Sequence, residues 1–374
     1  KLDAKLRVHA GARQHLLKDG RIPRERETMI FPALARTLRA IAKNGRDAFY
    51  QGAVAEDLVT TLNELGGLHT RADFEAQMTT ASYVEPISIN YGGFDVCELP
   101  PANQGITALI MLNMLKRIPA YRDTTALSTT RYHILMEAAR LAFAVRDTYV
   151  ADPERARVPV DAMLSDGFAD ELAKRIDPKR MTPNLGPVPT AGGTDTVYFS
   201  VADKDGMMVS FINSLFSAFG SAIVGPKSGV ALHNRGQGFR LDPKHPAAIA
   251  PGKRPMHTLV PAFAMKDGRP DMAFGVMGAN FQPMGHVYVV TNRVDHGLDA
   301  QEALDCPRMF YENGELGVEP SVPGHILEGL ALLGHKPVIR ADPWGGGQIV
   351  QRDHINALYV GASDPRKDGC ALGY

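Results

Sequence analysis

The sequence has few cysteines and no excess of charge of either sign. Its 374 residues include only three cysteines, Cys97, Cys306 and Cys370, which are widely spaced and form no CxxC pair. An odd and scattered set of cysteines fits a reducing compartment better than a disulfide framework. Lysine plus arginine and aspartate plus glutamate each total 41. This balance argues against a protein that binds nucleic acid or a membrane surface through bulk charge.

Long hydrophobic runs are also absent. The longest candidate, Ile106 to Leu115, is ended by Lys116 and Arg117, well short of the ~20 apolar residues that a membrane-spanning helix needs. The overall composition is that of a globular protein, so we expect a soluble protein with no membrane or nucleic-acid partner. Because the chain begins at Lys1, inside a charged segment, we expect a longer gene product. We expect a cytoplasmic location, or a periplasmic or secreted one if a signal peptide precedes residue 1.

The first half of the chain has the apolar spacing of helices. Apolar residues recur every three or four positions in several stretches, two of which end at glycine, as helices commonly do. Four helices are expected, at residues 31–44, 54–65, 106–118 and 132–145. Residues 87–91 and 94–98 alternate around Gly92-Gly93 and predict a β-hairpin.

From about residue 195 the apolar residues alternate instead. Residues 196–201 and 208–212 flank a tight turn and predict strand, turn, strand. Further turns are expected at Asp267-Gly268 and Asn313-Gly314, and helices at 300–305 and 325–333. This order favours stacked helical and sheet layers over a Rossmann alternation. Residues 181–193, rich in Pro, Gly and Thr, predict an exposed, flexible connector.

Familiar nucleotide and metal motifs do not fit. The segment Gly220–Ser228 is close to a phosphate-binding loop, but Pro226 separates the second glycine from Lys227 and removes a backbone N–H. The glycine run 345–347 has no strand–helix unit around it. The twelve histidines show no metal-ligand spacing with the cysteines. We therefore expect no cofactor and no metal.

The connector leads into a strand that begins with hydroxyl residues. Gly192 and Gly193 precede Thr194 and Thr196. A threonine hydroxyl is a weak nucleophile and needs a base; a threonine that becomes a chain N-terminus can use its own α-amine. Cleavage of a flexible connector would create such a terminus. From these features alone, an ordinary strand threonine remains the simpler interpretation.

Longer motifs favour a catalytic threonine over an ordinary strand threonine. TVYFSVADKDGMMVSF, from Thr196, resembles the start of the small subunit in the γ-glutamyltranspeptidase family of N-terminal-nucleophile hydrolases. The resemblance continues through FGSAIVGPKSGVALHN, GKRPMHTLVP and GASDPRKDGCALGY, and upstream through GGLHTRADF and ELPPANQGITAL. It implies an α+β fold, a four-layer αββα sandwich with two central, mainly antiparallel sheets.

The resemblance also implies an assembly and a catalytic set. Self-cleavage between Asp195 and Thr196 would give a mostly helical large-subunit part, 1–195, ending in the linker 181–195, and a small subunit, 196–374. The two would form a heterodimer, and two heterodimers could pair. Thr196 would be the nucleophile, Ser214 its hydrogen-bonding hydroxyl, and Gly278 and Ala279 the oxyanion-hole amides. For Ser214 and Gly278, a plain strand serine and a tight turn remain open.

The substrate-binding positions depart from the family. Those that the resemblance implies are Asn213, Phe216, Arg235, His257 and Thr258. Gly238 stands where γ-glutamyl transferases keep an acidic residue for the substrate ammonium. Arg235 replaces an amide, Phe216 an asparagine, and His257-Thr258 a pair of serines. We therefore expect a pocket that favours a carboxylate without an ammonium, although a surface ion pair for Arg235 and a structural role for His257 stay open.

These departures point to a hydrolase of a small anionic amide. The sequence is most similar to the oxamate amidohydrolase branch, which would give the acid and ammonia through an acyl-enzyme. One alternative is a γ-glutamyl transferase or hydrolase with a remodelled pocket. Another is a cephalosporin-type acylase, with Phe216, Phe219 and Phe281 as candidate pocket residues. A non-catalytic relic of the fold is the remaining possibility.

Overall fold

A computed structural model describes residues 2–183, 185 and 195–374. The chain divides into two compact units: unit 1 comprises Lys1–Val84 and Leu215–Arg235, and unit 2 comprises Glu85–Ser214 and Gly236–Tyr374. This spatial division differs from the expected cleavage-defined subunits, whose boundary at 195/196 lies inside unit 2. That boundary remains a prediction, and most of the predicted linker 181–195 lies outside the described residues. No described helix is both long and apolar enough to cross a membrane.

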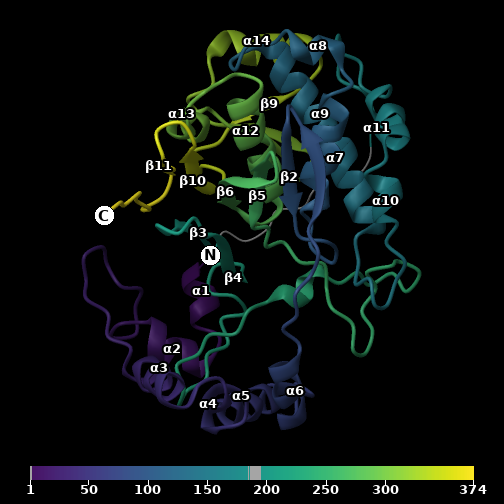
Figure 1. The fold of residues 1–374 in the computed structure, drawn as a ribbon. Coiled ribbons are helices and arrows are strands. Elements are labelled where there is room, and N and C mark those ends of the chain that lie inside the picture. The colour runs from purple at the N-terminus through teal and green to yellow at the C-terminus, as the bar shows by residue number, and fades with distance from the viewer. Residues whose placement is uncertain (1, 184, 186–194) are drawn as a thin grey trace. The chain divides into compact units, whose positions relative to one another are not determined.

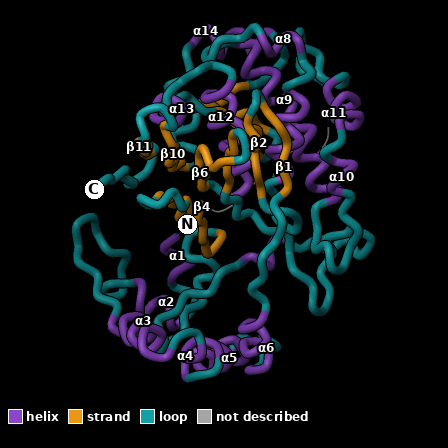
Figure 2. The backbone as a smooth tube through the Cα atoms, viewed as in Figure 1, coloured by secondary structure: helices purple, strands orange, loops and turns teal. Residues whose placement is uncertain are grey.

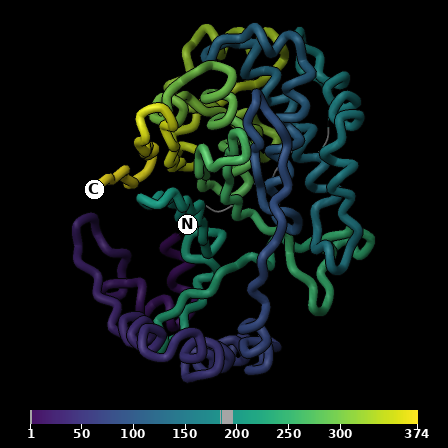
Figure 3. Tube along the Cα trace, viewed as in Figure 1, coloured from purple at the N-terminus to yellow at the C-terminus, as the bar shows by residue number. Residues whose placement is uncertain are grey.

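Unit 1 is built from helices and loops (Figure 2). Its helices are α1 (Leu2–Leu6), α2 (Ala10–Leu16), α3 (Pro32–Asn44), α4 (Asp47–Tyr50), α5 (Ala53–Glu64) and α6 (Arg71–Ala76), followed by the 3-10 turn η1 (Gln77–Thr79). The expected helices α3 and α5 are confirmed, and α3 ends at Gly45 with a φ of 64°. The distant segment 215–235 runs back beside these helices (Figure 3), where Thr37 Oγ1 donates to the Ser228 carbonyl at 2.8 Å.

Unit 2 is organised around a six-stranded sheet in which all neighbours are antiparallel. Its order is β1 (Ile87–Tyr91), β2 (Phe94–Glu98), β5 (Ala262–Lys266), β6 (Arg269–Met277), β10 (Gly346–Asp353) and β11 (Leu358–Ser363). The expected turns at Gly92-Gly93 and Asp267-Gly268 join β1 to β2 and β5 to β6, and all four residues have positive φ. A smaller sheet contains β7 (Met309–Glu312), β8 (Glu315–Val318) and β9 (Pro337–Ile339).

Helices cover one face of the six-stranded sheet (Figure 1). The main ones are α7 (Ile106–Leu115), α9 (Thr129–Tyr149), α12 (Gln282–Val294) and α13 (Ala300–Asp305), with α8 (Pro119–Arg122), α10 (Val160–Met163), α11 (Asp166–Ala173) and α14 (Gly324–Leu332) further out. All ten residues of α7 are buried, because this helix lies between the sheet and α9. The sequence analysis missed α12, since its core VYVV resembles a strand and only Pro283 marks its first turn.

The other face of the sheet carries the hairpin of β3 (Asp195–Ala202) and β4 (Met208–Phe216). Adjacent residues of β6 show the two faces: Val276 packs on Gly285 of α12, whereas Gly275 lies under the ring of Tyr198 on β3. The Tyr198 hydroxyl is 2.8 Å from Ser210 Oγ of β4. Helices, a first antiparallel sheet and a second one therefore stack in that order. The predicted α+β class with stacked antiparallel sheets is confirmed.

Gly275 is the position at which this stacking is most easily tested. A Cβ there would lie 2.3 Å from Tyr198 Cε2, so Gly275→Ala should force β3 away from β6 and destabilise the protein by about 1–3 kcal/mol. Thermal unfolding measures the loss. Gly167→Ala, in α11 with open space around the new Cβ, is the control and should be neutral or slightly stabilising. An equal midpoint for both variants would show that β3 is not seated on Gly275.

Candidate active site

The start of β3 places Thr196 beside Ser214. Burial alternates along the strand, so that Thr196 and Tyr198 face inward while Val197 and Phe199 are exposed. Thr196 is only 7% exposed, and its Oγ1 donates to Ser214 Oγ on β4 at 3.0 Å. The structure thus brings together the predicted nucleophile and the hydroxyl expected to bind it. The predicted scissile bond, between residues 195 and 196, lies at the first position of the strand.

The predicted oxyanion amides lie at the sharp corner that follows β6. Gly278 has a φ of 129° and Ala279 a φ of 50°. The φ of 129° strains any residue with a side chain at 278, and a Cβ there would lie only 3.1 Å from Gly345 Cα, so the position favours glycine. Ala279 tolerates the left-handed region at a cost of about 1 kcal/mol. Within the described residues, neither amide N–H of this pair donates a hydrogen bond, so both are available to an incoming anion.

Gln104 is a residue of this region that the sequence analysis missed. Its side chain, fully buried, donates from Nε2 to the carbonyls of Thr258 at 3.0 Å and Ala279 at 2.8 Å. Its backbone N–H donates to the His257 carbonyl at 3.0 Å. Gln104 therefore joins the predicted substrate segment 257–258 to the predicted oxyanion corner. The sequence carries no signal for this role beyond a lone amide inside ELPPANQGI.

Arg235 and Phe216 meet within unit 1. The guanidinium carbon of Arg235 lies 5.7 Å from the centre of the Phe216 ring, within the range of a cation–π interaction. Arg235 is buried, and this burial lowers the pKa of its guanidinium to about 10. Phe216 has a φ of 81°, a region that asparagine enters easily and a bulky side chain does not. The chain thus accepts local strain to place an aromatic ring against this arginine.

The remaining predicted residues fall in several places. Asn213 is exposed on the face of β4 opposite Ser214, so it does not join the Thr196 pair. Phe281 is core, packed edge-on against Phe310, and Phe219 packs on a small apolar cluster in unit 1. These contacts give no support to one pocket lined by both Phe219 and Phe281.

The His257 ring accepts, at Nδ1, the backbone N–H of Leu259 at 3.3 Å. Whether His257 also binds substrate stays a prediction.

Gly238 has no room for a side chain. A Cβ at this position would lie 2.7 Å from the Met256 carbonyl oxygen and 3.2 Å from Pro255 Cβ. An acidic residue at this position, which the resemblance implies for γ-glutamyl transferases, would need the backbone to move. The packing around Gly238 therefore excludes a carboxylate side chain, and replacing the glycine by an acidic residue would also require a change in the neighbouring backbone.

In the segment 220–228, which resembles a phosphate-binding loop, backbone amides bind a carboxylate of the same chain. The buried carboxylate of Asp57, on α5, accepts from the backbone N–H groups of Ser228 at 2.8 Å and Lys227 at 3.2 Å. A Cβ at Gly225 would meet this carboxylate at 2.4 Å. The loop amides bind a side chain of their own chain, which agrees with the rejection of a nucleotide site.

Asp57→Ala tests that arrangement. The substitution leaves one buried and one partly buried amide without an acceptor, and a hydrogen bond to a charged group is worth about 1.5–3 kcal/mol. We expect a lower midpoint in thermal unfolding and faster proteolysis within 225–229, with Asp57→Asn less affected because its amide oxygen still accepts. Unchanged stability and proteolysis in Asp57→Ala would show that the loop does not depend on this carboxylate.

Among the described residues, His133, Glu137 and His335 form a group with the composition of a metal site. Their hydrogen bonds are already complete: His133 Nδ1 lies 2.7 Å from His335 Nε2, and the outer nitrogens bond the Asp177 carbonyl and the Tyr311 hydroxyl. Every ring nitrogen is used in one donor–acceptor chain, and Glu137 is paired with Arg140 at 2.8 Å. This chemistry fits a structural polar network and does not fit a metal site.

The same network predicts acid sensitivity. Burial, with the nearby charges of His133 and Arg140, lowers the pKa of His335 to about 3. The unfolded chain then binds more protons than the folded one between about pH 6.5 and 3, so stability falls as pH falls through this window. His335→Gln should make the pH dependence of the unfolding free energy shallower by about one proton. His325→Gln, an exposed change on α14, is the control; equal slopes for all three proteins would contradict the prediction.

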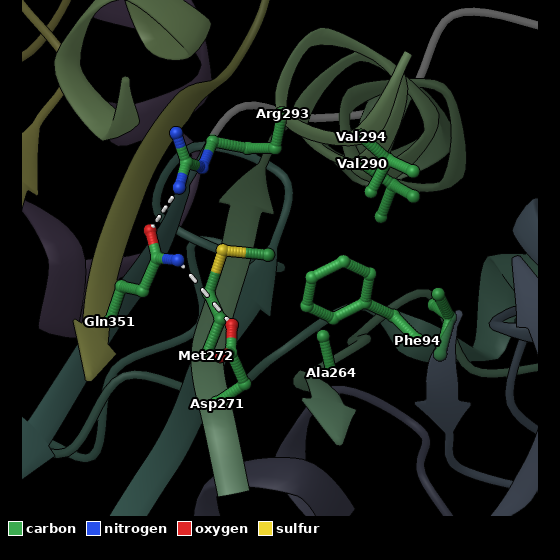
Figure 4. Close-up of a pocket in the computed structure, with 9 residues that line it drawn as sticks. Phe94, Ala264, Asp271, Met272, Val290, Arg293, Val294 and Gln351 are labelled. Atoms are coloured by element: carbon green, nitrogen blue, oxygen red, sulfur yellow. Dashed lines mark hydrogen bonds between the residues drawn. The ribbon is translucent and has the colours of Figure 1, made fainter. Parts of the chain in front are cut away.

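A small pocket lies away from the predicted catalytic residues, between α12 and the sheet (Figure 4). It is mostly apolar, and at its edge Gln351 bonds Arg293 at 2.5 Å and Asp271 at 3.4 Å. Burial raises the pKa of the Asp271 carboxyl. The free volume is about 40 Å³, against about 300–1,000 Å³ for ordinary ligand pockets. The pocket is too small for an organic substrate.

Thr196 at the start of β3 is hydrogen-bonded to Ser214 near the end of β4, on stacked antiparallel sheets, an arrangement that fits an N-terminal-nucleophile hydrolase. The profile described as Gamma-glutamyltranspeptidase matches residues 2–374. The chain therefore belongs to the gamma-glutamyltranspeptidase family, and the resemblance noted in the sequence is confirmed.

Named relatives of the chain are hydrolases of amide bonds. It is 35% identical over 380 residues to the oxamate amidohydrolase proenzyme of Klebsiella pneumoniae, covering 99% of this chain and 70% of that one. It is 34% identical over 365 residues to the glutathione hydrolase-like YwrD proenzyme of Bacillus subtilis, covering 95% and 68%. The solved cephalosporin acylase of Bacillus halodurans is 39% identical with a TM-score of 0.86, covering 96% and 66%. The chain thus spans about two thirds of the length of these relatives.

Proposed function

We propose that this protein is a self-processing amidohydrolase whose nucleophile is Thr196. The hydrogen bond from Thr196 Oγ1 to Ser214 Oγ carries the proposal. Cleavage before Thr196 would free its α-amine to act as general base, while Ser214 holds the hydroxyl in one rotamer. Relatives described as proenzymes support this processing step. The products would be a large and a small subunit that remain together.

The chemistry then follows from the groups around the nucleophile. Thr196 Oγ attacks the substrate carbonyl, and the amides of Gly278 and Ala279 bind the oxygen on which charge develops. The amine product leaves with the proton that the α-amine has taken, and water resolves the acyl-enzyme. Loss of one such amide donor typically costs about 10²–10³ in kcat.

The proposed substrate is a small amide with a carboxylate next to the scissile bond. The packing at Gly238 leaves no space for an acidic side chain that would bind an ammonium. The resemblance implies Arg235 as a substrate-binding residue, and a guanidinium suits two-point binding of a carboxylate. Oxamate has a carboxylate next to its amide and carries no ammonium, and the 35% sequence identity to an oxamate amidohydrolase proenzyme supports this choice. Water, and not an amine, is the proposed acceptor.

A second candidate is an acylase with an apolar acyl pocket. It is favoured by the 39% identity to a solved cephalosporin acylase and by the aromatic ring of Phe216 in place of an asparagine. In that case Arg235 would bind a carboxylate on an acyl side chain, and the substrate would be larger.

A substrate panel separates the candidates. The purified protein is assayed for ammonia from oxamate, for p-nitroaniline from γ-glutamyl-p-nitroanilide and for release of the glutaryl side chain from a glutaryl cephalosporin. We expect oxamate to give the highest kcat/KM, and Arg235→Gln to raise its KM by about tenfold, the loss of a charge-assisted hydrogen bond. A preference for the γ-glutamyl compound would overturn the anionic-substrate proposal, and a preference for the cephalosporin would select the acylase.

Thr196 variants provide the control for this panel. Thr196→Ala should remove turnover of every amide, whereas Thr196→Ser keeps a hydroxyl and should retain part of it. Residual turnover by Thr196→Ala equal to the unaltered protein would assign the activity to another residue or to a contaminant.

A further inference from the structure

The corner after β6 combines a strained residue with both local and distant hydrogen bonds. Ala279 is held at a φ of 50°, a strained value for a residue with a Cβ, and such strain persists only where the surroundings enforce it. One plane of the corner is fixed locally, because the Gly278 carbonyl accepts from the Phe281 N–H at 2.9 Å. Since a trans peptide is planar, this bond directs the Ala279 N–H to the opposite side. The next plane also has a local bond, because the Ala279 carbonyl accepts from the Gln282 N–H, and the side chain of Gln104 gives the same carbonyl a second hydrogen bond at 2.8 Å.

Gln104 links the second plane to a distant segment through its side-chain amide. One Nε2 hydrogen bonds the Ala279 carbonyl and the other bonds the Thr258 carbonyl. The orientation of the amide is fixed by its partners, since its oxygen faces a guanidinium and its nitrogen faces two carbonyls. The Ala279 carbonyl is thereby held by two donors, Gln282 N–H and Gln104 Nε2, and the direction of the following peptide is held with it.

Arg146 on α9 holds Gln104 in that orientation. Its Nη1 donates to Gln104 Oε1 at 2.7 Å and to Asn280 Oδ1 at 3.0 Å. Its other nitrogens bond Asp147, and its guanidinium lies 4.6 Å from the Phe143 ring centre. The arginine is only 3% exposed, and burial lowers the pKa of its guanidinium.

Burying an arginine adds little net stability, because its charge loses its hydration. Desolvation of a charge commonly cancels the gain from its ion pair, and well-packed apolar residues often do as well. Geometry gives a better reason here, because a planar guanidinium can fix several acceptors at once. Two of the acceptors of Arg146, Gln104 and Asn280, flank the same corner.

We propose that Gln104 and Arg146 are positioning residues that hold the Gly278–Asn280 corner in the geometry needed to bind the oxyanion. This inference rests on the proposed amidohydrolase function. Their role in this proposal is indirect: Arg146 orients the amide of Gln104, and Gln104 adds a second hydrogen bond to the Ala279 carbonyl within the strained corner. The pair also ties the corner to the segment 257–258, so that both parts of the site share one support.

Gln104→Met and Arg146→Met test this assignment by removing the hydrogen bonds at similar volume. Contacts that strengthen only in the transition state affect kcat more than KM. A loosened corner should therefore lower kcat by about 10- to 100-fold, on the scale of a misplaced catalytic group, with a much smaller change in KM. Activity is measured on the best amide of the panel, at a temperature where each variant is shown to be folded. Arg146→Lys keeps the charge but loses the planar set of guanidinium donors, so it should recover little of the lost kcat.

Asn113→Leu is the matched control. Asn113 on α7 is also a buried amide held by an arginine, Arg117 at 2.9 Å, and it also donates to a backbone carbonyl, that of Leu164 at 3.0 Å. It should lose stability comparably but keep its kcat. Normal kcat in Gln104→Met, or an equal loss in Asn113→Leu, would overturn the positioning role while the proposed function stands. Absence of turnover by the unaltered protein on every amide would overturn the proposed function and this assignment together.

Discussion

The packing of β3 onto β6 is the constraint on which the account of the site depends. Tyr198 lies against Gly275 because that position has no Cβ, and the strand alternation then turns Thr196 inward beside Ser214. The same strand β6 ends two residues later at the corner that carries Gly278 and Ala279. One face-to-face contact between two sheets thus sets the direction of the nucleophile, and the end of the same strand carries the proposed oxyanion amides.

Most of the fold could be predicted from the sequence wherever a local signal was strong. The hairpin at Gly92-Gly93 and the helix ending at Gly45 follow from positions that need positive φ. The expected helix around Tyr132–Val145 is α9, and it is buried as its composition required. Helix α12 was missed because a buried helix and a buried strand share the same apolar run, and only packing against Val276 distinguishes them.

The site was predicted unevenly, for a physical reason. Thr196 and Ser214 carry motifs that can be recognised, and the structure places their hydroxyls in contact. Gln104 and Arg146 act through backbone carbonyls and a peptide plane, which leave no trace in the spacing of residues. Asn213 is the neighbour of Ser214 in the sequence but lies on the other face of β4, and its contact with substrate stays a prediction. Neighbours along a strand point to opposite faces, so proximity in the sequence alone does not show that two residues share a site.

The central claim is that the chain cuts itself before Thr196 and uses that threonine as nucleophile. Intact mass of the purified protein under denaturing conditions tests it most directly, with sequencing of the new N-terminus. The account predicts two species that sum to the chain, the smaller beginning at Thr196, and a single species for Thr196→Ala. A single uncleaved species for the unaltered protein, or cleavage that leaves Thr196 inside a chain, would contradict it.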